Sequence, residues 1–206
     1  MARHWERNPE RAALVSKEGM SNPFFTIGHS TRSIEAFVDL LRAGEVRAVV
    51  DVRTIPRSRH NPQYNEDALG ETLGAYQVGY TRIAELGGRR SRVPEVPPDV
   101  NGWWDNQSFH NYADYALSSE DFRRGLDRLI ALGRERRVAM MCAESVWWRC
   151  HRRIVADYLL ADDEQAFHVM GEDRVEPAKL TDAARRQGDR LAYPTKAPHL
   201  PLDGFA

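Results

Sequence analysis

Residues Val138 to Leu160 read VAMMCAESVWWRCHRRIVADYLL and join a short apolar strand to an amphipathic helix. The run Val138–Met141 is typical of a buried strand, and Cys142 and Glu144 follow directly after it. Further along, one helical face carries the apolar residues Ile154, Val155, Tyr158 and Leu159. In an open α/β sheet, ligands bind at the carboxyl ends of the strands. This junction is therefore predicted to hold the functional site.

The alternation of strand and helix continues on both sides of this junction. Stripes of apolar residues predict helices, one capped by Ser33 and another by Ser118 or Ser119. Apolar, β-rich runs predict strands at residues 24–27, 48–52, 79–83, 138–141 and 166–170. The pattern predicts an α/β fold: a single domain with a mostly parallel sheet of about five strands between helical layers.

The two ends of the chain differ from this middle part. Residues 1–22 are polar and are expected to form a flexible N-terminal arm before the α/β domain, which covers residues 23–172. The polar segment 173–206 is expected to be a weakly structured C-terminal extension, with a weak helix around residues 178–187. Within the domain, residues 91–108 lack a periodic pattern but contain two adjacent tryptophans, which predicts a lid packed across the site.

The composition is that of an ordinary globular domain, with 206 residues of which 42% are hydrophobic. The 29 basic and 30 acidic side chains nearly cancel, so net charge gives no argument for a nucleic-acid or membrane partner. No apolar run reaches the roughly 18 residues of a membrane span, and the N-terminus lacks the apolar core of a signal peptide. We expect a cytoplasmic protein with no membrane partner. Its two cysteines are too few for a disulfide framework and should be thiols or ligands.

The loops that follow the predicted strands are rich in arginine. Because parallel strands end at the same edge of a sheet, these loops should converge there. A guanidinium binds phosphate through two hydrogen bonds, so the arginines predict a phosphate-bearing ligand, with a tryptophan to stack on a base or ring. The predicted substrate-binding residues are Ser30, Asp51, Arg53, Arg57, Arg59, Arg89, Trp148 and Arg152. The alternative is that these arginines are solvated or paired with Asp51, Glu85 and Glu144.

Cys150 lies at the start of a predicted helix, beside His151 and several arginines. That position lowers the pKa of a thiol and suits nucleophilic or redox chemistry. Cys150 also continues the apolar stripe of its helix, and burial as a small apolar residue explains it equally well. With Cys142 and Glu144 these residues are of ligand types that metals use. The spacing C-x₇-C-H matches none of the common zinc arrangements, however, so no metal is predicted and any cofactor stays unknown.

Two more residues have both a chemical and a structural interpretation. Glu144 ends a buried strand near arginines, so it is either a general base or the ion partner that holds Arg53 or Arg152. His29 follows a glycine after the first strand and is either an acid or base, or a histidine bonded to a backbone carbonyl. The predicted catalytic residues are Cys142, Glu144, Cys150, His151 and His29.

With these motifs assembled, the chain resembles the bacterial family catalogued as domain of unknown function 488. The resemblance covers roughly residues 24 to 172. The motifs that carry it, in chain order, are Thr26–Thr31, Asp51–Ser58, Glu85–Arg89, Phe109–Ala113, Cys142–Glu144 and Cys150–Arg152. An ordered series of this kind is far more specific than any one motif. The resemblance implies one domain with one site, but the family has no settled activity that it could imply for this chain.

Two classes of function remain for this site. The first is an enzyme acting on a phosphate-bearing substrate, a nucleotide or nucleic acid, with Cys150, Glu144 and His151 near the chemistry. The alternative is a non-catalytic nucleic-acid or small-ligand binding module, in which the same polar residues only maintain loop geometry. The enzyme is favoured because a pure binding module would more naturally show a broad basic face and net positive charge.

Overall fold

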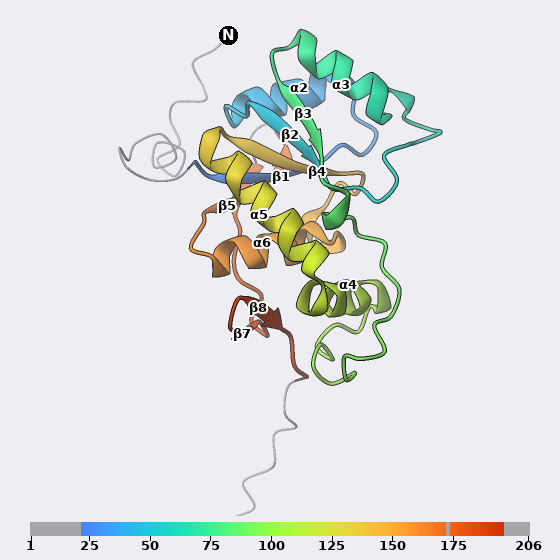
Figure 1. Cartoon of the computed structure of the whole chain (residues 1–206). Helices are drawn as coiled ribbons and strands as arrows, with labels where there is room; N and C mark the ends of the chain where they lie inside the picture. Colours follow the sequence, from blue (N-terminus) through green and yellow to red (C-terminus); the bar gives the residue numbers. More distant parts are fainter. Residues whose placement is uncertain (1–21, 172–173, 196–206) are drawn as a thin grey trace, which may run out of the picture.

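A six-stranded sheet lies between two layers of α-helices in the computed structural model, which describes residues 22–171 and 174–195 (Figure 1). The strands are β1 (Phe24–Gly28), β2 (Ala48–Asp51), β3 (Gly79–Arg82), β4 (Val138–Cys142), β5 (Ala166–Gly171) and β6 (Arg174–Pro177). Their order is β3-β2-β4-β1-β5-β6. Strands β1 to β5 are parallel and β6 is antiparallel to β5. The predicted α/β fold with a mostly parallel sheet is confirmed, with one strand more than expected.

Among the described residues, three of the five α-helices begin at a capping side chain, and α3 and α6 do not. The helices are α2 (Ile34–Ala43), α3 (Glu66–Ala75), α4 (Gln107–Ser118), α5 (Glu120–Glu135) and α6 (Arg152–Ala161). Ser33 caps α2 by accepting from the backbone N–H of Ala36, and Ser119 caps α5. Both caps were predicted. Asn65 precedes α3, but its side chain accepts a hydrogen bond from the backbone N–H of Ser58 (2.8 Å) instead of capping the helix.

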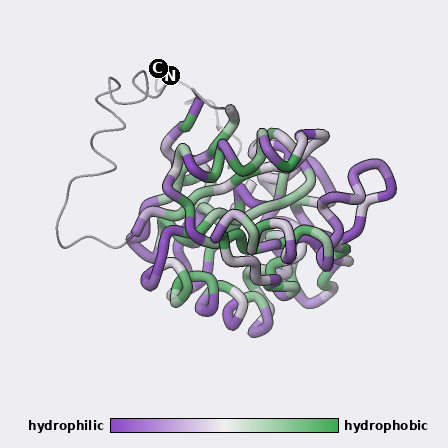
Figure 2. Tube along the Cα trace, turned by 90° about the horizontal axis from the view of Figure 1, so that it is seen from above, coloured by the Kyte–Doolittle hydropathy of each residue, from purple (hydrophilic) through white to green (hydrophobic). Residues whose placement is uncertain are grey.

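The sheet is buried on both faces, because successive side chains of a strand point to opposite sides. Phe24 of β1 packs with α4, α5 and α6, whereas Phe25 packs with α2 and α3. Val50 and Val49 of β2 divide in the same way. Figure 2 shows green, hydrophobic segments in the middle of the molecule and a largely purple, hydrophilic loop that projects from it. This double burial explains the continuous apolar runs in the sequence.

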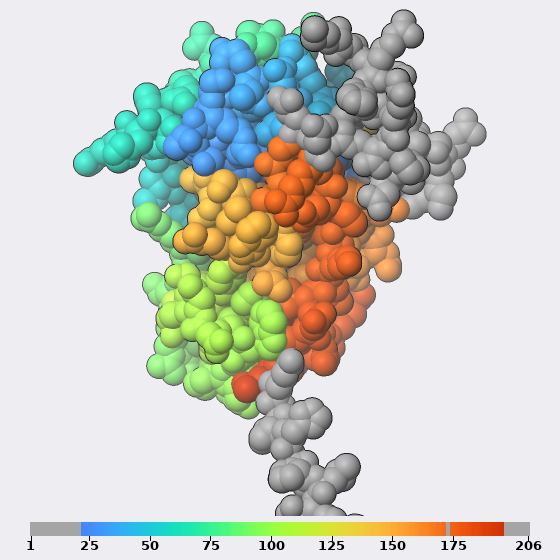
Figure 3. Space-filling view, turned by 180° about the vertical axis from the view of Figure 1, so that it is seen from behind, coloured from blue at the N-terminus to red at the C-terminus, as the bar shows by residue number. Residues whose placement is uncertain are grey.

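The polar segment after Gly171 contains regular structure, although the sequence predicts a weakly structured extension there. Besides β6 it forms a two-stranded hairpin of β7 (Arg185–Gln187) and β8 (Arg190–Ala192). The prediction of a helix around residues 178–187 is wrong, because contacts with the rest of the domain fix the conformation of this segment. The buried carboxylate of Asp157 accepts hydrogen bonds from the Thr181 N–H (2.9 Å) and the Tyr193 hydroxyl (3.0 Å). Figure 3 shows the segment, orange to red, running beside α4. The predicted N-terminal arm lies outside the described residues, apart from Asn22.

The loop at residues 91–108 was predicted to form a lid across the site, but its tryptophans pack into the core, and only Ser91 and Ser108 at its ends reach the pocket described below. Trp104 is buried and stacks on Phe109 at the start of α4, with ring centroids 5.0 Å apart. The loop is fixed on its other side by the C-terminal segment, since Tyr193 and Trp103 form a backbone hydrogen bond of 3.0 Å. Its tryptophans therefore belong to the core under α4, and their apolar area stabilises the fold.

The strand order brings the loops after β2, β3 and β4 together at the carboxyl edge of the sheet. Each of these loops contains a single turn of 3₁₀-helix, at Pro62–Tyr64, Ala84–Leu86 and Trp147–Arg149 respectively. Within residues 22–171 and 174–195, no helix has both the length and the apolar character that crossing a membrane requires.

Candidate functional site

A pocket of about 650 Å³ opens at this edge of the sheet, a volume within the range of small-molecule sites. The loop after β2 contributes Arg53, Thr54, Ile55 and Arg57, and the loop after β3 contributes Gly88, Arg89, Arg90 and Ser91. The loop after β4 contributes Cys142, Ala143, Glu144, Arg149, Cys150 and His151, and the start of α4 contributes Ser108 and Phe109. The junction singled out in the sequence is therefore one wall of the pocket.

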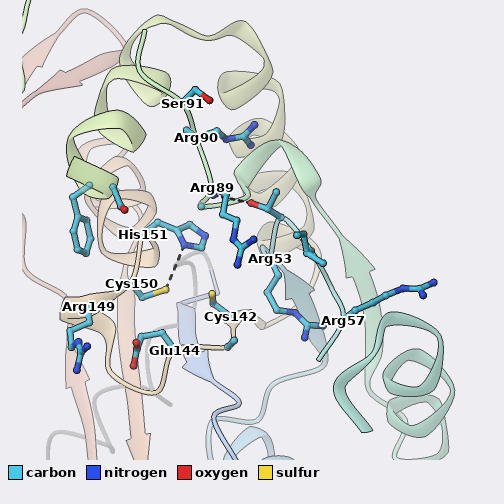
Figure 4. A pocket seen from close by; sticks show the side chains of 16 residues that line it. Arg53, Arg57, Arg89, Arg90, Ser91, Cys142, Glu144, Arg149, Cys150 and His151 are labelled. Carbon is cyan, nitrogen blue, oxygen red and sulfur yellow. Dashed lines mark hydrogen bonds between the residues drawn. The ribbon is translucent and has the colours of Figure 1, made fainter. Parts of the chain in front are cut away.

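Two thiols and an imidazole meet at the bottom of this pocket. The Sγ atoms of Cys142 and Cys150 and a ring nitrogen of His151 all lie within 4.8 Å of one another (Figure 4). Cys150 Sγ is 3.6 Å from His151 Nδ1. The other ring nitrogen, Nε2, is 3.0 Å from the carbonyl oxygen of Val52. Since a carbonyl only accepts, Nε2 carries the proton of the neutral ring and Nδ1 faces the sulfur.

Gly88 lets the loop after β3 approach this cluster. A Cβ atom at this position would lie 2.2 Å from His151 Nδ1, far inside any permitted contact. On the other side, the ring of His151 packs against Tyr112, with ring centroids 5.0 Å apart. The imidazole is therefore held between α4 and a loop that only glycine can form at this distance.

Arg152 lies directly beneath the cluster rather than in the pocket wall, where the sequence predicts it to bind substrate. Its side chain is only 1% exposed, and none of the described carboxylates pairs with it. Nε donates to Cys150 Sγ (3.1 Å) and Nη2 donates to the carbonyl oxygen of Glu144 (2.6 Å). A buried guanidinium requires a compensating negative charge, and the Cys150 sulfur is the group placed to supply it.

The two cysteines consequently differ in acidity. Burial raises the pKa of Cys150, but the hydrogen bond from Cys142 and the charge of Arg152 lower it, and the pKa comes out well below its ordinary value. The pKa of Cys142 is well above its ordinary value, chiefly because Cys142 is hydrogen-bonded to Cys150 and is itself buried. Cys150 is thus the more acidic of the two thiols, and both cysteines are free.

Glu144 has a carboxylate that is not neutralised by an arginine. Its Oε1 atom lies 3.4 Å from Ser145 Oγ and 3.5 Å from the backbone nitrogen of Val146. Of the two predicted roles, the ion partner of Arg53 or Arg152 is wrong, because Arg152 contacts only the Glu144 backbone and Arg53 pairs with Asp51. The carboxylate faces the pocket, which leaves the general-base role as a hypothesis.

Asp51 and Arg53, both predicted to bind substrate, form a buried ion pair under the wall. Asp51 is fully buried and accepts from Arg53 Nε (2.9 Å), Arg53 Nη2 (2.5 Å) and the hydroxyl of Tyr80 (2.7 Å). Arg53 Nη2 also donates to the carbonyl oxygen of Tyr64 (2.7 Å). Arg53 reaches the pocket, but its charge is compensated, so the pair positions the loop after β2.

His29 and Ser30, at the end of β1, do not line the pocket. His29 is buried, stacks on Tyr64 with centroids 4.1 Å apart, and bonds the carbonyl oxygen of Ser30 through Nδ1 (2.8 Å). Its Nε2 atom lies 3.3 Å from Arg53 Nη1, and burial is the main cause that lowers the pKa of His29 to about 4. Of the two interpretations of His29, these contacts fit the structural one, in which a neutral ring bonds a backbone carbonyl and supports Arg53.

Three exposed arginines line the pocket without a side-chain hydrogen bond or ion pair to any described residue: Arg57, Arg89 and Arg149. In Figure 4 the Arg89 side chain reaches toward the cysteine and histidine cluster, whereas Arg57 extends away from it at the rim. Arg59 was predicted to bind substrate but does not line the pocket. Arg90 lines it but donates to the carbonyl oxygens of Gly87 and Glu85, so its charge is held by the loop.

The two tryptophans of the junction between β4 and α6, Trp147 and Trp148, lie outside the pocket. Trp147 stacks on His168 of β5, with ring centroids 4.3 Å apart. Trp148, predicted to stack on a substrate ring, is 42% exposed but does not line the pocket. Sequence reasoning missed Thr54, Ser91, Ser108, Phe109 and Arg149 as pocket residues. Arg149 lies in the junction between β4 and α6, where the sequence already predicts the site, and could have been found there, whereas Ser108 and Phe109 reach the pocket through the packing of α4.

The sequence model of one family, described as Domain of unknown function DUF488, matches residues 33–159, more than half of the chain. The chain belongs to the DUF488 family. Every residue that lines the pocket lies inside the region of the DUF488 match, while His29 lies outside it. No curated protein and no solved structure matches the chain. The DUF488 family has no assigned activity, so function has to be argued from the geometry of the pocket.

Proposed function

We propose that this protein is an enzyme that acts on a phosphate-bearing substrate, a nucleotide or nucleic acid, in the pocket at the carboxyl edge of the sheet. One observation carries the proposal: arginines without a counter-charge among the described residues share a pocket with a thiol, imidazole and carboxylate cluster. The arginines supply binding and the cluster supplies reactive groups.

The arginines favour a phosphate because their charges are uncompensated. Arg57, Arg89 and Arg149 come from three different loops, so separate segments of the chain bring positive charge to one pocket. Guanidinium groups bind phosphate oxygens in pairs, and the pocket is large enough for a nucleotide or for one nucleotide of a strand.

The carboxylate of Glu144 favours an enzyme over a binding module. A site built only to bind an anion is weakened by a carboxylate in its wall, since like charges repel. In an enzyme the same group accepts or donates a proton during the reaction. Cys150 and His151 are placed on the same side of the pocket, where they face a bound substrate. A reducing, cytoplasmic location belongs to the proposal, because the chemistry requires free thiols.

The experiment is a ligand-stabilisation assay with inorganic phosphate, a mononucleotide and a short oligonucleotide. Each compound that binds should raise the melting temperature of the wild type, and the shift should decrease with rising salt. Arg89→Ala should lose most of the shift and Arg57→Ala a smaller part, because Arg89 reaches into the pocket and Arg57 lies at its rim. Arg42→Ala removes an exposed arginine of α2 and is the matched control.

The comparison among the three compounds assigns the substrate class. A larger shift with the oligonucleotide than with the mononucleotide indicates nucleic acid. Equal shifts in wild type, Arg89→Ala and Arg42→Ala would show that the ions act on the whole surface, and the proposed phosphate site would be rejected.

A further inference from the structure

We propose that Cys142, Cys150 and His151 form a site for Zn²⁺, with three protein ligands and a fourth position open to the pocket. This inference goes beyond the proposed substrate class, because metal binding does not require the arginines. It also replaces the expectation from the sequence, in which the spacing of these residues predicts no metal. The spacing is uncommon because the ligands come from the end of β4 and the start of α6, with a 3₁₀ turn between them.

The distances fit a tetrahedral ion. Zinc lies about 2.3 Å from thiolate sulfur and about 2.0 Å from imidazole nitrogen, which places a sulfur and a nitrogen ligand about 3.5 Å apart. Cys150 Sγ and His151 Nδ1 are 3.6 Å apart, and all three donor atoms lie within 4.8 Å of one another. The donor atoms therefore already lie at separations close to those that one tetrahedral ion requires.

The groups behind the ligands are those that orient a metal site. A zinc-bound histidine usually donates its second ring N–H to a carbonyl or carboxylate, and His151 Nε2 donates to the carbonyl oxygen of Val52 at 3.0 Å. This bond leaves the lone pair of Nδ1 for the ion. Arg152 Nε donates to Cys150 Sγ at 3.1 Å, as an N–H group does toward a metal-bound thiolate.

The open position indicates a catalytic rather than a structural zinc. Structural zinc sites have four protein ligands, whereas catalytic sites have three and leave the fourth for water or substrate. All three donors line the pocket, and so does Glu144, which is not one of the donor group. A zinc ion held by these residues would make a bound water more acidic, and the Glu144 carboxylate in the same pocket would be the group to hold its proton. Two thiolates balance the charge of Zn²⁺, so Arg152 leaves the centre positive for an anionic substrate.

The test is metal binding by the full-length protein after treatment with a chelator. The wild type should bind one Zn²⁺, measured by competition with a chromophoric chelator, and one Co²⁺ with the absorption bands of thiolate ligation in a tetrahedral site. Cys142→Ser, Cys150→Ser and His151→Asn should each weaken Zn²⁺ binding at least tenfold. His60→Asn, in an exposed loop, and Glu144→Gln should bind as the wild type does.

The cobalt spectrum of the wild type decides the question even where a variant does not fold. Absence of thiolate bands, or equal Zn²⁺ affinity in wild type and the three ligand variants, overturns the proposal. The zinc proposal and the phosphate proposal can fail separately, because Arg89→Ala should lose phosphate binding and retain full Zn²⁺ binding. A protein that binds Zn²⁺ but no phosphate compound rejects the substrate class, and one that binds phosphate but no Zn²⁺ rejects the metal site.

Discussion

The arginines under the pocket and the arginines in its wall differ in burial and in their hydrogen-bond partners. Arg53 and Arg152 are buried and each donates to a nearby acidic group, Asp51 for the first and the Cys150 sulfur for the second. Arg57 and Arg89 are exposed, and their side chains have no partner among the described residues. Arginines of the same loops therefore have two roles. Those that are buried with a partner hold the site in place, and those that are exposed without a partner are available to a ligand.

The largest effect is expected at Arg53. Arg53→Ala leaves the fully buried carboxylate of Asp51 without its counter-charge, which should lower the free energy of unfolding by about 3–5 kcal/mol. Urea denaturation measures the loss. The double variant Asp51→Asn with Arg53→Met removes both charges and should recover a large part of it. If Arg53→Ala loses less than about 1 kcal/mol, Arg53 belongs with the wall arginines.

His29, which contacts the buried Arg53, should make the free energy of unfolding depend on pH. Burial holds the folded pKa at about 4, below the ordinary 6.5, so the unfolded chain takes up a proton first as the pH falls. The stability contributed by the neutral ring is complete above pH 6.5 and is lost as the pH falls toward 4. The loss should reach about 2–3 kcal/mol.

The His29 contribution has to be separated from two other buried groups. His168, with a pKa of about 4, acts in the same direction, and Asp157, raised to about 6, acts in the opposite one. His29→Phe keeps a ring against Tyr64 but does not titrate. Its denaturation profile from pH 7 to pH 4 should be shallower than that of the wild type. Parallel profiles would mean that folding does not lower the pKa of His29.

A smaller effect is expected at Gly88, where the loop after β3 contacts His151 of the cluster. Gly88→Ala places a Cβ against His151 and should cost about 1–3 kcal/mol through overpacking. It should also slow the reaction of Cys150 with iodoacetamide, because the imidazole is displaced from the sulfur. Gly74→Ala, in α3 with no atom within 4 Å of the new Cβ, should be neutral or stabilising. Unchanged thiol reactivity in Gly88→Ala would show that His151 does not activate Cys150.

The smallest effect on stability is expected in the wall. Arg89→Ala should change the free energy of unfolding by no more than about 0.5 kcal/mol, because the exposed guanidinium has no partner among the described residues. The same variant should lose stabilisation by phosphate compounds. A strongly destabilised Arg89→Ala would place this residue with Arg53 and remove the distinction between the two groups.

The sequence predicts the layers of this fold well because they depend on local patterns. Apolar runs such as Ala48–Asp51 and capping serines such as Ser33 specify strands and helices on their own. The order of the strands, β6 and the hairpin of β7 and β8 depend on contacts between distant residues, such as Asp157 with Thr181 and Tyr193. No local pattern contains these contacts.

The candidate site was predicted in composition but not in arrangement. Cys142, Glu144, Cys150 and His151 do meet in one pocket, because they flank a single strand-to-helix junction. Arg152 is buried under the cluster and His29 is buried outside the pocket. The burial of a polar side chain cannot be predicted from its neighbours in the sequence. The close donor geometry of the cluster depends on side-chain placement, which the spacing C-x₇-C-H does not specify.

Turnover is the most direct test of an enzyme in this pocket. Wild-type protein loaded with Zn²⁺ and chelator-treated protein should each be incubated with a panel of nucleotides and short oligonucleotides, and the products followed by mass spectrometry. The expected result is conversion of at least one phosphate-bearing compound by the wild type and by Arg42→Ala, loss of conversion in Cys150→Ser, and slower conversion in Glu144→Gln. Compounds that bind through Arg89 and yet remain unconverted, with and without Zn²⁺, would contradict an enzyme and leave a binding module.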